Sequence, residues 1–137
     1  MIRVIHKMRS GKDIPDHAYI GRPTILGNPF THLTKDTKAI EIVETVEVAV
    51  DRYAGWFYEQ LKTTPEFRDA AFDLVEQNRR KGELNLACWC KDELKPSPKD
   101  HMCHADVVRE FVEFTYPAVV HYQKARRLMI APDPEYQ

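Results

Sequence analysis

The chain has 137 residues, of which 43% are hydrophobic and 30% are charged. This length suits one domain, and the composition excludes a disordered or collagen-like chain. Lys and Arg number 20 against 21 Asp and Glu, so the net charge of −1 excludes an overall positive field that would gather nucleic acid non-specifically.

The apolar runs and the cysteines predict the cellular compartment of the protein. No apolar run reaches the roughly 20 residues of a membrane helix, and residues 1–6 alternate like a strand instead of forming the apolar segment of a signal peptide. The three cysteines are an odd number, and two of them are separated by one residue, which argues against a disulfide scaffold. We therefore expect a cytoplasmic protein with reduced thiols and no membrane partner.

The first half of the chain changes from strand to helix patterns. Alternating apolar residues predict a strand over residues 1–9, and Ser10–Asp13 has the composition of a turn. Residues 19–30 contain two glycines and two prolines, which exclude a regular helix but permit a short strand over 18–20. Apolar spacings of three and four predict a helix from Thr37, capped by Asp36 or Thr37 and ending near residue 63.

The second half predicts one helix, one buried strand and further helices. The second helix covers 65–80 and ends at Gly82. Residues 84–90 have the apolar composition of a central strand, and a long charged loop covers 91–102. A helix follows from about His104, with a break at residues 116–117, a further helical piece over 118–129 and a frayed tail.

This order of elements predicts an α/β fold, with a small parallel or mixed sheet and helices packed on it. We expect a single domain over residues 1–130 and a flexible C-terminal tail over 131–137. Ligands bind outside the carboxyl ends of strands in such folds. The loops 21–36 and 91–102 both follow predicted strands, so they should meet at the same edge of the sheet.

A cysteine and histidine cluster follows the predicted central strand, and it has three interpretations. Cys88, Cys90, Cys103 and His104 could hold a structural zinc ion, since three thiolates and one imidazole suit tetrahedral zinc. Alternatively, Cys103 is a catalytic thiol at the start of a helix, with His104 or Asp106 as its proton partner. In the third interpretation these side chains belong to the core and carry no chemistry. The sequence leaves the three open, and zinc is the only cofactor it suggests.

The segment 19–30 supplies the candidate ligand-binding residues Tyr19, Gly21, Arg22, Gly27 and Asn28. Its glycines permit a close approach of the backbone to a ligand. The guanidinium of Arg22 suits a phosphate or carboxylate. Asn28 could donate to a ligand or hydrogen-bond within its own turn, and the segment could also be an ordered turn without a ligand.

The sequence resembles the family called Domain of Unknown Function 4326 in two motifs. These are residues 19–23 with Gly27-Asn28-Pro29-Phe30, and Cys88-Trp89-Cys90 followed by Cys103-His104-Ala105-Asp106. The resemblance spans roughly residues 2–115 and implies a protein of bacteria or their phages. Ala105 stands where the family has glycine, and the loop 91–102 is longer than is usual there. The resemblance adds weight to the site but implies no reaction.

Two functional hypotheses follow from these observations. In the first, the protein binds or processes a nucleotide-like or other anionic small molecule, held by Arg22 and Asn28, with Cys103 or His104 as the catalytic group and Asp106 orienting the histidine. In the second, the protein is an interaction module, with or without a stabilising metal, that binds a protein partner through surfaces such as 124–129. The sequence leaves open whether the protein is an enzyme.

Overall fold

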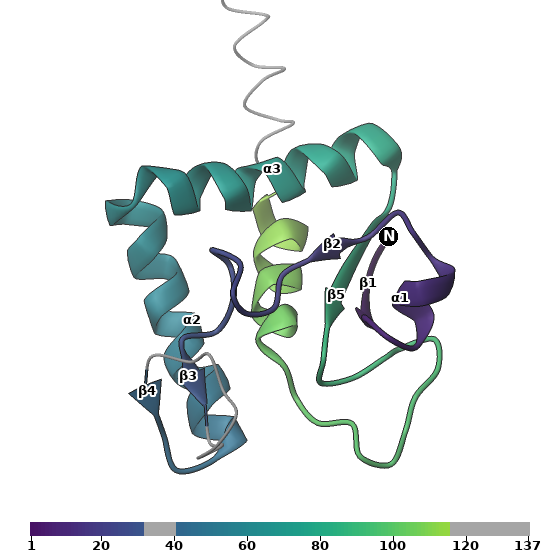
Figure 1. The fold of residues 1–137 in the computed structure, drawn as a ribbon. Helices are drawn as coiled ribbons and strands as arrows, with labels where there is room; N and C mark the ends of the chain where they lie inside the picture. The colour runs from purple at the N-terminus through teal and green to yellow at the C-terminus, as the bar shows by residue number, and fades with distance from the viewer. Residues whose placement is uncertain (32–40, 116–137) are drawn as a thin grey trace, which may run out of the picture.

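Three parallel strands form the centre of the protein in a computed structural model that describes residues 1–31 and 41–115 (Figure 1). The middle strand is β5 (Leu84–Cys88), which lies between β1 (Ile2–His6) and β2 (Ala18–Tyr19). All of its residues are buried, as expected for an apolar strand paired on both sides. The predicted α/β fold with a central buried strand is confirmed, although that strand ends two residues earlier than predicted.

Three helices provide most of the core beside this sheet. They are α2 (Val46–Thr63), α3 (Pro65–Lys81) and a helix that begins at residue 104 and is described to residue 115. Figure 1 shows the 104–115 helix between α2 and the sheet, with α3 crossing above them. Phe57 of α2 is fully buried, and its ring centroid lies 5.2 Å from those of Phe67 and Phe111. These edge-on aromatic contacts join all three helices.

The first long helix begins later than the sequence predicts. Residues before it form β4 (Glu41–Ile42), which pairs in parallel with β3 (Phe30–Thr31). Thr45 then caps α2, because its hydroxyl oxygen accepts a hydrogen bond from the backbone N–H of Val48 at 3.2 Å. The start at Thr37 is therefore wrong, and the candidate caps Asp36 and Thr37 lie outside the described residues. The apolar spacing before Thr45 resembled that of the helix itself, which is why the boundary was misplaced.

The boundaries of α3 agree with the prediction. Pro65 occupies the first helical position, and Gly82 ends the helix with a φ of 74°, in the left-handed region that favours glycine. A smaller difference concerns α1 (Ser10–Asp13), which is a single helical turn where a non-helical turn was predicted.

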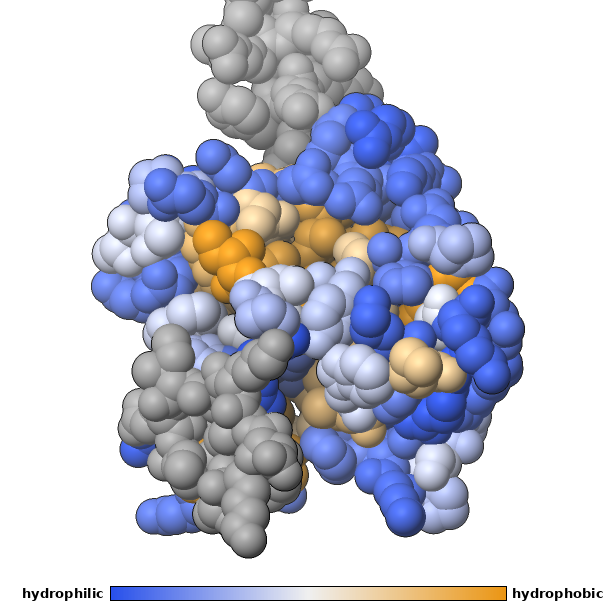
Figure 2. Space-filling model, in the orientation of Figure 1, coloured by the Kyte–Doolittle hydropathy of each residue, from blue (hydrophilic) through white to orange (hydrophobic). Residues whose placement is uncertain are grey.

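Several predictions concern the far end of the chain, namely the break at 116–117, the helix over 118–129 and the tail over 131–137, and these lie outside the described residues. Within 1–31 and 41–115, no helix is long and apolar enough to cross a membrane. Figure 2 shows mainly hydrophilic side chains around α1 and the end of α3, and an apolar area beneath the middle of α3 where the core reaches the surface.

Candidate functional site

A pocket of about 180 Å³ lies where the loops after β2 and β5 meet. The prediction that these two loops converge at one edge of the sheet is confirmed by its lining. Five residues singled out from the sequence contribute to its wall: Arg22, Asn28, Cys90, Cys103 and His104. Trp89, His101 and Met102 complete the side formed by the second loop, and Phe30 with three apolar residues of α2 closes the other side.

The loop that carries Arg22 is folded tightly on itself. The Tyr19 hydroxyl donates to the carbonyl of Arg22 at 2.7 Å, and the Gly27 backbone N–H donates to the carbonyl of Thr24 at 2.9 Å. A side chain at Gly27 would place its Cβ 2.9 Å from the backbone nitrogen of Arg22, and one at Gly21 would meet the Tyr19 ring. The glycines predicted to allow a ligand close to the backbone are thus used for contacts within the loop.

Asn28 fixes the end of this loop to α2. Its side-chain nitrogen donates to the carbonyl of Ala49 at 3.2 Å, and its side-chain oxygen accepts the backbone N–H of Phe30 at 2.9 Å. Of the two roles open from the sequence, the local hydrogen bond within its own turn is therefore present. Binding of a ligand by Asn28, which also lines the pocket, stays a prediction.

Arg22 brings positive charge to the pocket wall. Its side chain is half-buried, and one guanidinium nitrogen lies 3.4 Å from the carbonyl oxygen of Phe30. The charge is close enough to act on its neighbours, because it disfavours the protonated form of His104 and favours ionisation of Cys90. Arg22 is thus the cationic side chain nearest to the thiols and the imidazole within the lining of the pocket.

His104 holds the same loop from the opposite side. Its Nε2 lies 2.7 Å from the carbonyl oxygen of Ile20, so Nε2 carries the proton and donates it. Nδ1 is then an acceptor, and it faces the Cys103 sulfur at 3.5 Å. Burial lowers the pKa of His104, although the Ile20 carbonyl favours the protonated ring. The imidazole is therefore neutral at pH 7.

Asp106 does not orient His104 as predicted. Its carboxylate accepts the backbone N–H of Cys103 at 3.2 Å, so it caps the first turn of the 104–115 helix. It also forms ion pairs with Lys91 at 2.7 Å and Arg109 at 2.8 Å. The Ile20 carbonyl has the orienting role instead, and a long-range contact of this kind leaves no local signal in the sequence.

The three cysteines are free thiols that hydrogen-bond with one another. Contacts with Cys103 and Cys90, together with the backbone N–H groups of Cys90 and Lys91, lower the pKa of Cys88 to about 2. The pKa of Cys90 rises to about 12, and that of Cys103 rises well above its usual value. Cys88 Sγ also lies 3.6 Å from the Lys91 carbonyl oxygen, a contact that favours the protonated thiol. The four contacts that lower the pKa of Cys88 have the larger effect. These contacts favour ionisation of Cys88 over ionisation of Cys90 or Cys103.

The thiols do not form a metal centre as they are arranged. Within residues 1–31 and 41–115, no group of three or more His, Cys, Asp or Glu side chains is placed to hold a metal ion. His104 could offer only Nδ1, because its Nε2 is hydrogen-bonded to Ile20. The zinc interpretation of Cys88, Cys90, Cys103 and His104 thus gains no support from the geometry.

Residues 4–114 match the family described as Domain of unknown function (DUF4326). The chain belongs to this family. The DUF4326 match includes every residue that lines the pocket. No curated protein and no solved structure matches the chain. Ala105 is fully buried in the hydrophobic core, and its backbone N–H donates to the Cys103 sulfur at 3.4 Å.

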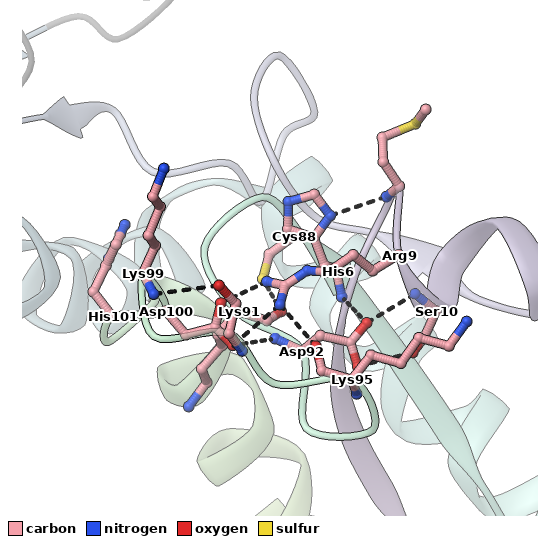
Figure 3. Close-up of polar contacts among 12 residues, drawn as sticks. His6, Arg9, Ser10, Cys88, Lys91, Asp92, Lys95, Lys99, Asp100 and His101 are labelled. Atoms are coloured by element: carbon pink, nitrogen blue, oxygen red, sulfur yellow. Dashed lines mark hydrogen bonds and ion pairs between the residues drawn. The ribbon is translucent and has the colours of Figure 1, made fainter.

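The long loop 91–102 of this DUF4326 protein is ordered by two carboxylates, Asp92 and Asp100, whose roles the sequence analysis did not identify (Figure 3). Asp92 is 1% exposed and accepts hydrogen bonds from the backbone of His6, Leu94 and Lys95 and from both donors of Ser10. Asp100 accepts Arg9 at 2.6 Å, and this hydrogen bond is the main reason that its pKa falls to about 2. These contacts fasten the loop to β1 and α1.

Trp89 is the second feature that the sequence analysis misjudged. The alternation of faces in the predicted strand 84–90 would place Trp89 opposite Cys88 and Cys90, whereas Trp89 is 53% exposed and lines the pocket. The strand ends at Cys88, so the alternation of faces no longer applies to the residue that follows. An aromatic residue directly after the carboxyl end of a central strand was the available signal.

Proposed function

We propose that the pocket binds a small anionic molecule, such as a nucleotide, whose charged group contacts Arg22. The observation that carries this proposal is the charge of the wall. Among the described residues that line the pocket there is one arginine and two histidines, and none is Asp or Glu. Arg22 supplies the positive charge of this wall, because His104 is neutral and its Nε2 already donates to the Ile20 carbonyl.

Order in the loop also supports binding. Asn28 and His104 fasten it to two helices, so the backbone that carries Arg22 is fixed before a ligand arrives. A ligand then does not have to order this loop, which reduces the conformational entropy lost on binding.

The same site argues against a reaction at Cys103. The sulfur is 1% exposed, and its hydrogen bonds to the other two thiols raise its pKa well above the usual value. A thiol nucleophile needs the thiolate form and access to its substrate. We therefore propose binding as the function and include no covalent step.

The proposal is tested by titration calorimetry of the whole chain with 5′-mononucleotides, ribose 5-phosphate and inorganic phosphate. Removing a charged hydrogen-bond donor costs roughly 1.5–3 kcal/mol, so Arg22→Ala should weaken binding by about tenfold or more. Arg22→Lys should recover only part of the affinity, since it keeps the charge without the planar guanidinium. Arg80→Ala, on the exposed face of α3, is the matched control and should bind as the wild type does.

Two results would overturn the proposal. One is unchanged affinity in a folded Arg22→Ala variant. The other is the absence of binding by any of these anions at millimolar concentration, which would favour the interaction module instead. Thermal unfolding followed by circular dichroism shows whether each variant is folded.

A further inference from the structure

Trp89 combines exposure with a fixed position, which is unusual for a large aromatic side chain. It lines the pocket and is 53% exposed. Its indole N–H donates to the Tyr19 hydroxyl at 2.8 Å, and the His6 ring meets it edge-on at 5.4 Å. Because the polar atom of the indole is already paired, the surface left open to solvent is apolar ring.

Tyr19 connects this ring to the backbone of Arg22. The Tyr19 hydroxyl that accepts the Trp89 hydrogen bond donates its own proton to the Arg22 carbonyl at 2.7 Å. One hydroxyl group thus links the end of β5 with the loop after β2. The hydrogen bonds of Tyr19 therefore hold the Arg22 backbone close to the Trp89 ring, and both residues line one pocket.

The size of the pocket indicates how a ligand would use both groups. About 180 Å³ is less than the roughly 300–1,000 Å³ of pockets that enclose a whole drug-sized ligand. The pocket can hold the charged part of a ligand beside Arg22, while the rest of the ligand extends past the rim. The exposed ring of Trp89 is the apolar surface that such a part would meet.

We propose that the ligand carries an aromatic base that stacks on Trp89 while its phosphate lies at Arg22, so that the ligand class is the nucleoside phosphates. This inference rests on the proposed function and narrows it. Every nucleobase has a face that can stack on an aromatic side chain, so the arrangement selects for a base without selecting which one. The hydrogen bond to Tyr19 supports stacking, because it reduces the freedom that the indole would lose on binding.

The experiment compares adenosine 5′-monophosphate with ribose 5-phosphate, which has the phosphate and the sugar but no base. Calorimetric titrations use the wild type, Trp89→Leu and Trp89→Phe. Stacking on an aromatic side chain is worth roughly 1–3 kcal/mol, so Trp89→Leu should weaken binding of the nucleotide about 5- to 150-fold. The affinity of Trp89→Leu for ribose 5-phosphate should equal that of the wild type. Trp89→Phe should keep most of the affinity for the nucleotide.

The outcomes separate this inference from the proposed function. Equal wild-type affinities for the two ligands, or an unchanged nucleotide affinity in Trp89→Leu, would overturn stacking while leaving the anion site intact. An equal loss for both ligands in Trp89→Leu would also overturn it, since Trp89 would then only support the loop through Tyr19. The proposed function fails separately, if neither ligand binds or if Arg22→Ala binds both as the wild type does.

Discussion

Asp92 is the residue whose replacement tests the structure most directly. The perturbation is Asp92→Asn, which keeps the shape of the side chain but turns one carboxylate oxygen into an NH₂ group. Each oxygen of Asp92 accepts at least two hydrogen bonds, from His6 and Ser10 on one side and from Leu94 and Lys95 on the other. Whichever way the amide turns, its NH₂ group faces two backbone N–H donors, which lose their acceptor.

The expected loss can be worked out from the pKa of Asp92. Burial alone would raise this pKa, but the hydrogen bonds from Ser10, Lys95 and His6 lower it from 3.8 to about 2. At 1.36 kcal/mol for each pH unit between the two values, ionisation contributes roughly 2 kcal/mol at neutral pH. Solvent near the loop screens part of this. With the cost of the unpaired N–H donors, we expect Asp92→Asn to lower the free energy of unfolding by about 3 kcal/mol.

The dependence on pH has a definite sign. The pKa of Asp92 is lower in the folded state, so its contribution is present above about pH 4 and is lost as the pH falls toward 2. The same two pKa values mean that about half of the contribution is lost at pH 3. The difference in stability between the wild type and Asp92→Asn should therefore narrow between pH 7 and pH 3.

Urea unfolding at both pH values, followed by circular dichroism, measures this difference. Asp69→Asn on the exposed face of α3 is the matched control and should change stability by less than about 0.5 kcal/mol. A loss below that amount for Asp92→Asn at pH 7 would refute the network in Figure 3. A large loss that is the same at pH 7 and pH 3 would refute the lowered pKa.

Two further predictions concern the pocket wall. Gly27→Ala should destabilise the protein by about 1–3 kcal/mol in thermal unfolding, because its Cβ would lie 2.9–3.0 Å from backbone atoms of Arg22 and Thr24. Gly55→Ala in α2 is the control: its Cβ meets nothing within 4 Å, so it should be neutral or stabilising. Equal effects of the two substitutions would contradict this geometry. Cys90 should be the first thiol alkylated by iodoacetamide, since Cys88 and Cys103 are buried. With its pKa raised to about 12, Cys90 should react about tenfold faster for each unit of pH from 7 to 10. Mass spectrometry measures the rate for each thiol. A plateau in the Cys90 rate below pH 9, or modification of Cys103 before Cys90, would contradict the raised pKa or the burial on which this prediction rests.

Elements with their own local signals were the ones that the sequence predicted well. β5 has a single polar residue, Asn85, among its five, and α3 has Pro65 at its first position and Gly82 after its end. The meeting of the two loops followed from the parallel topology. The start of α2 was predicted too early, because the apolar residues before the Thr45 cap have the same spacing as those in the helix.

The order within the loop 91–102 could not be predicted from local patterns. Asp92 and Asp100 look like ordinary surface carboxylates in the sequence, yet their partners Ser10 and Arg9 are more than 80 residues away along the chain. The same holds for His104, whose partner Ile20 is 84 residues distant. A residue's type indicates what it can bind, but its partner depends on the tertiary fold.

Residues of both family motifs hold the loop that follows β2. His104 in the late motif grips the carbonyl of Ile20, and Asn28 in the early motif grips the carbonyl of Ala49 in α2. Tyr53 of α2 donates to the carbonyl of Leu26 at 2.6 Å and packs edge-on against His104. His104 and Asn28 therefore both hold the loop in place.

This division of roles determines what the motifs can say about chemistry. The role of these side chains in holding the loop is enough to explain why the motifs contain them, without any reaction. The motifs are therefore evidence for the shape of the loop. Evidence for the ligand must come from groups whose chemistry faces the pocket, chiefly Arg22 and Trp89. Substitution of these two residues, with Asn28 and His104 left in place, is therefore the way to change the ligand without changing the fold.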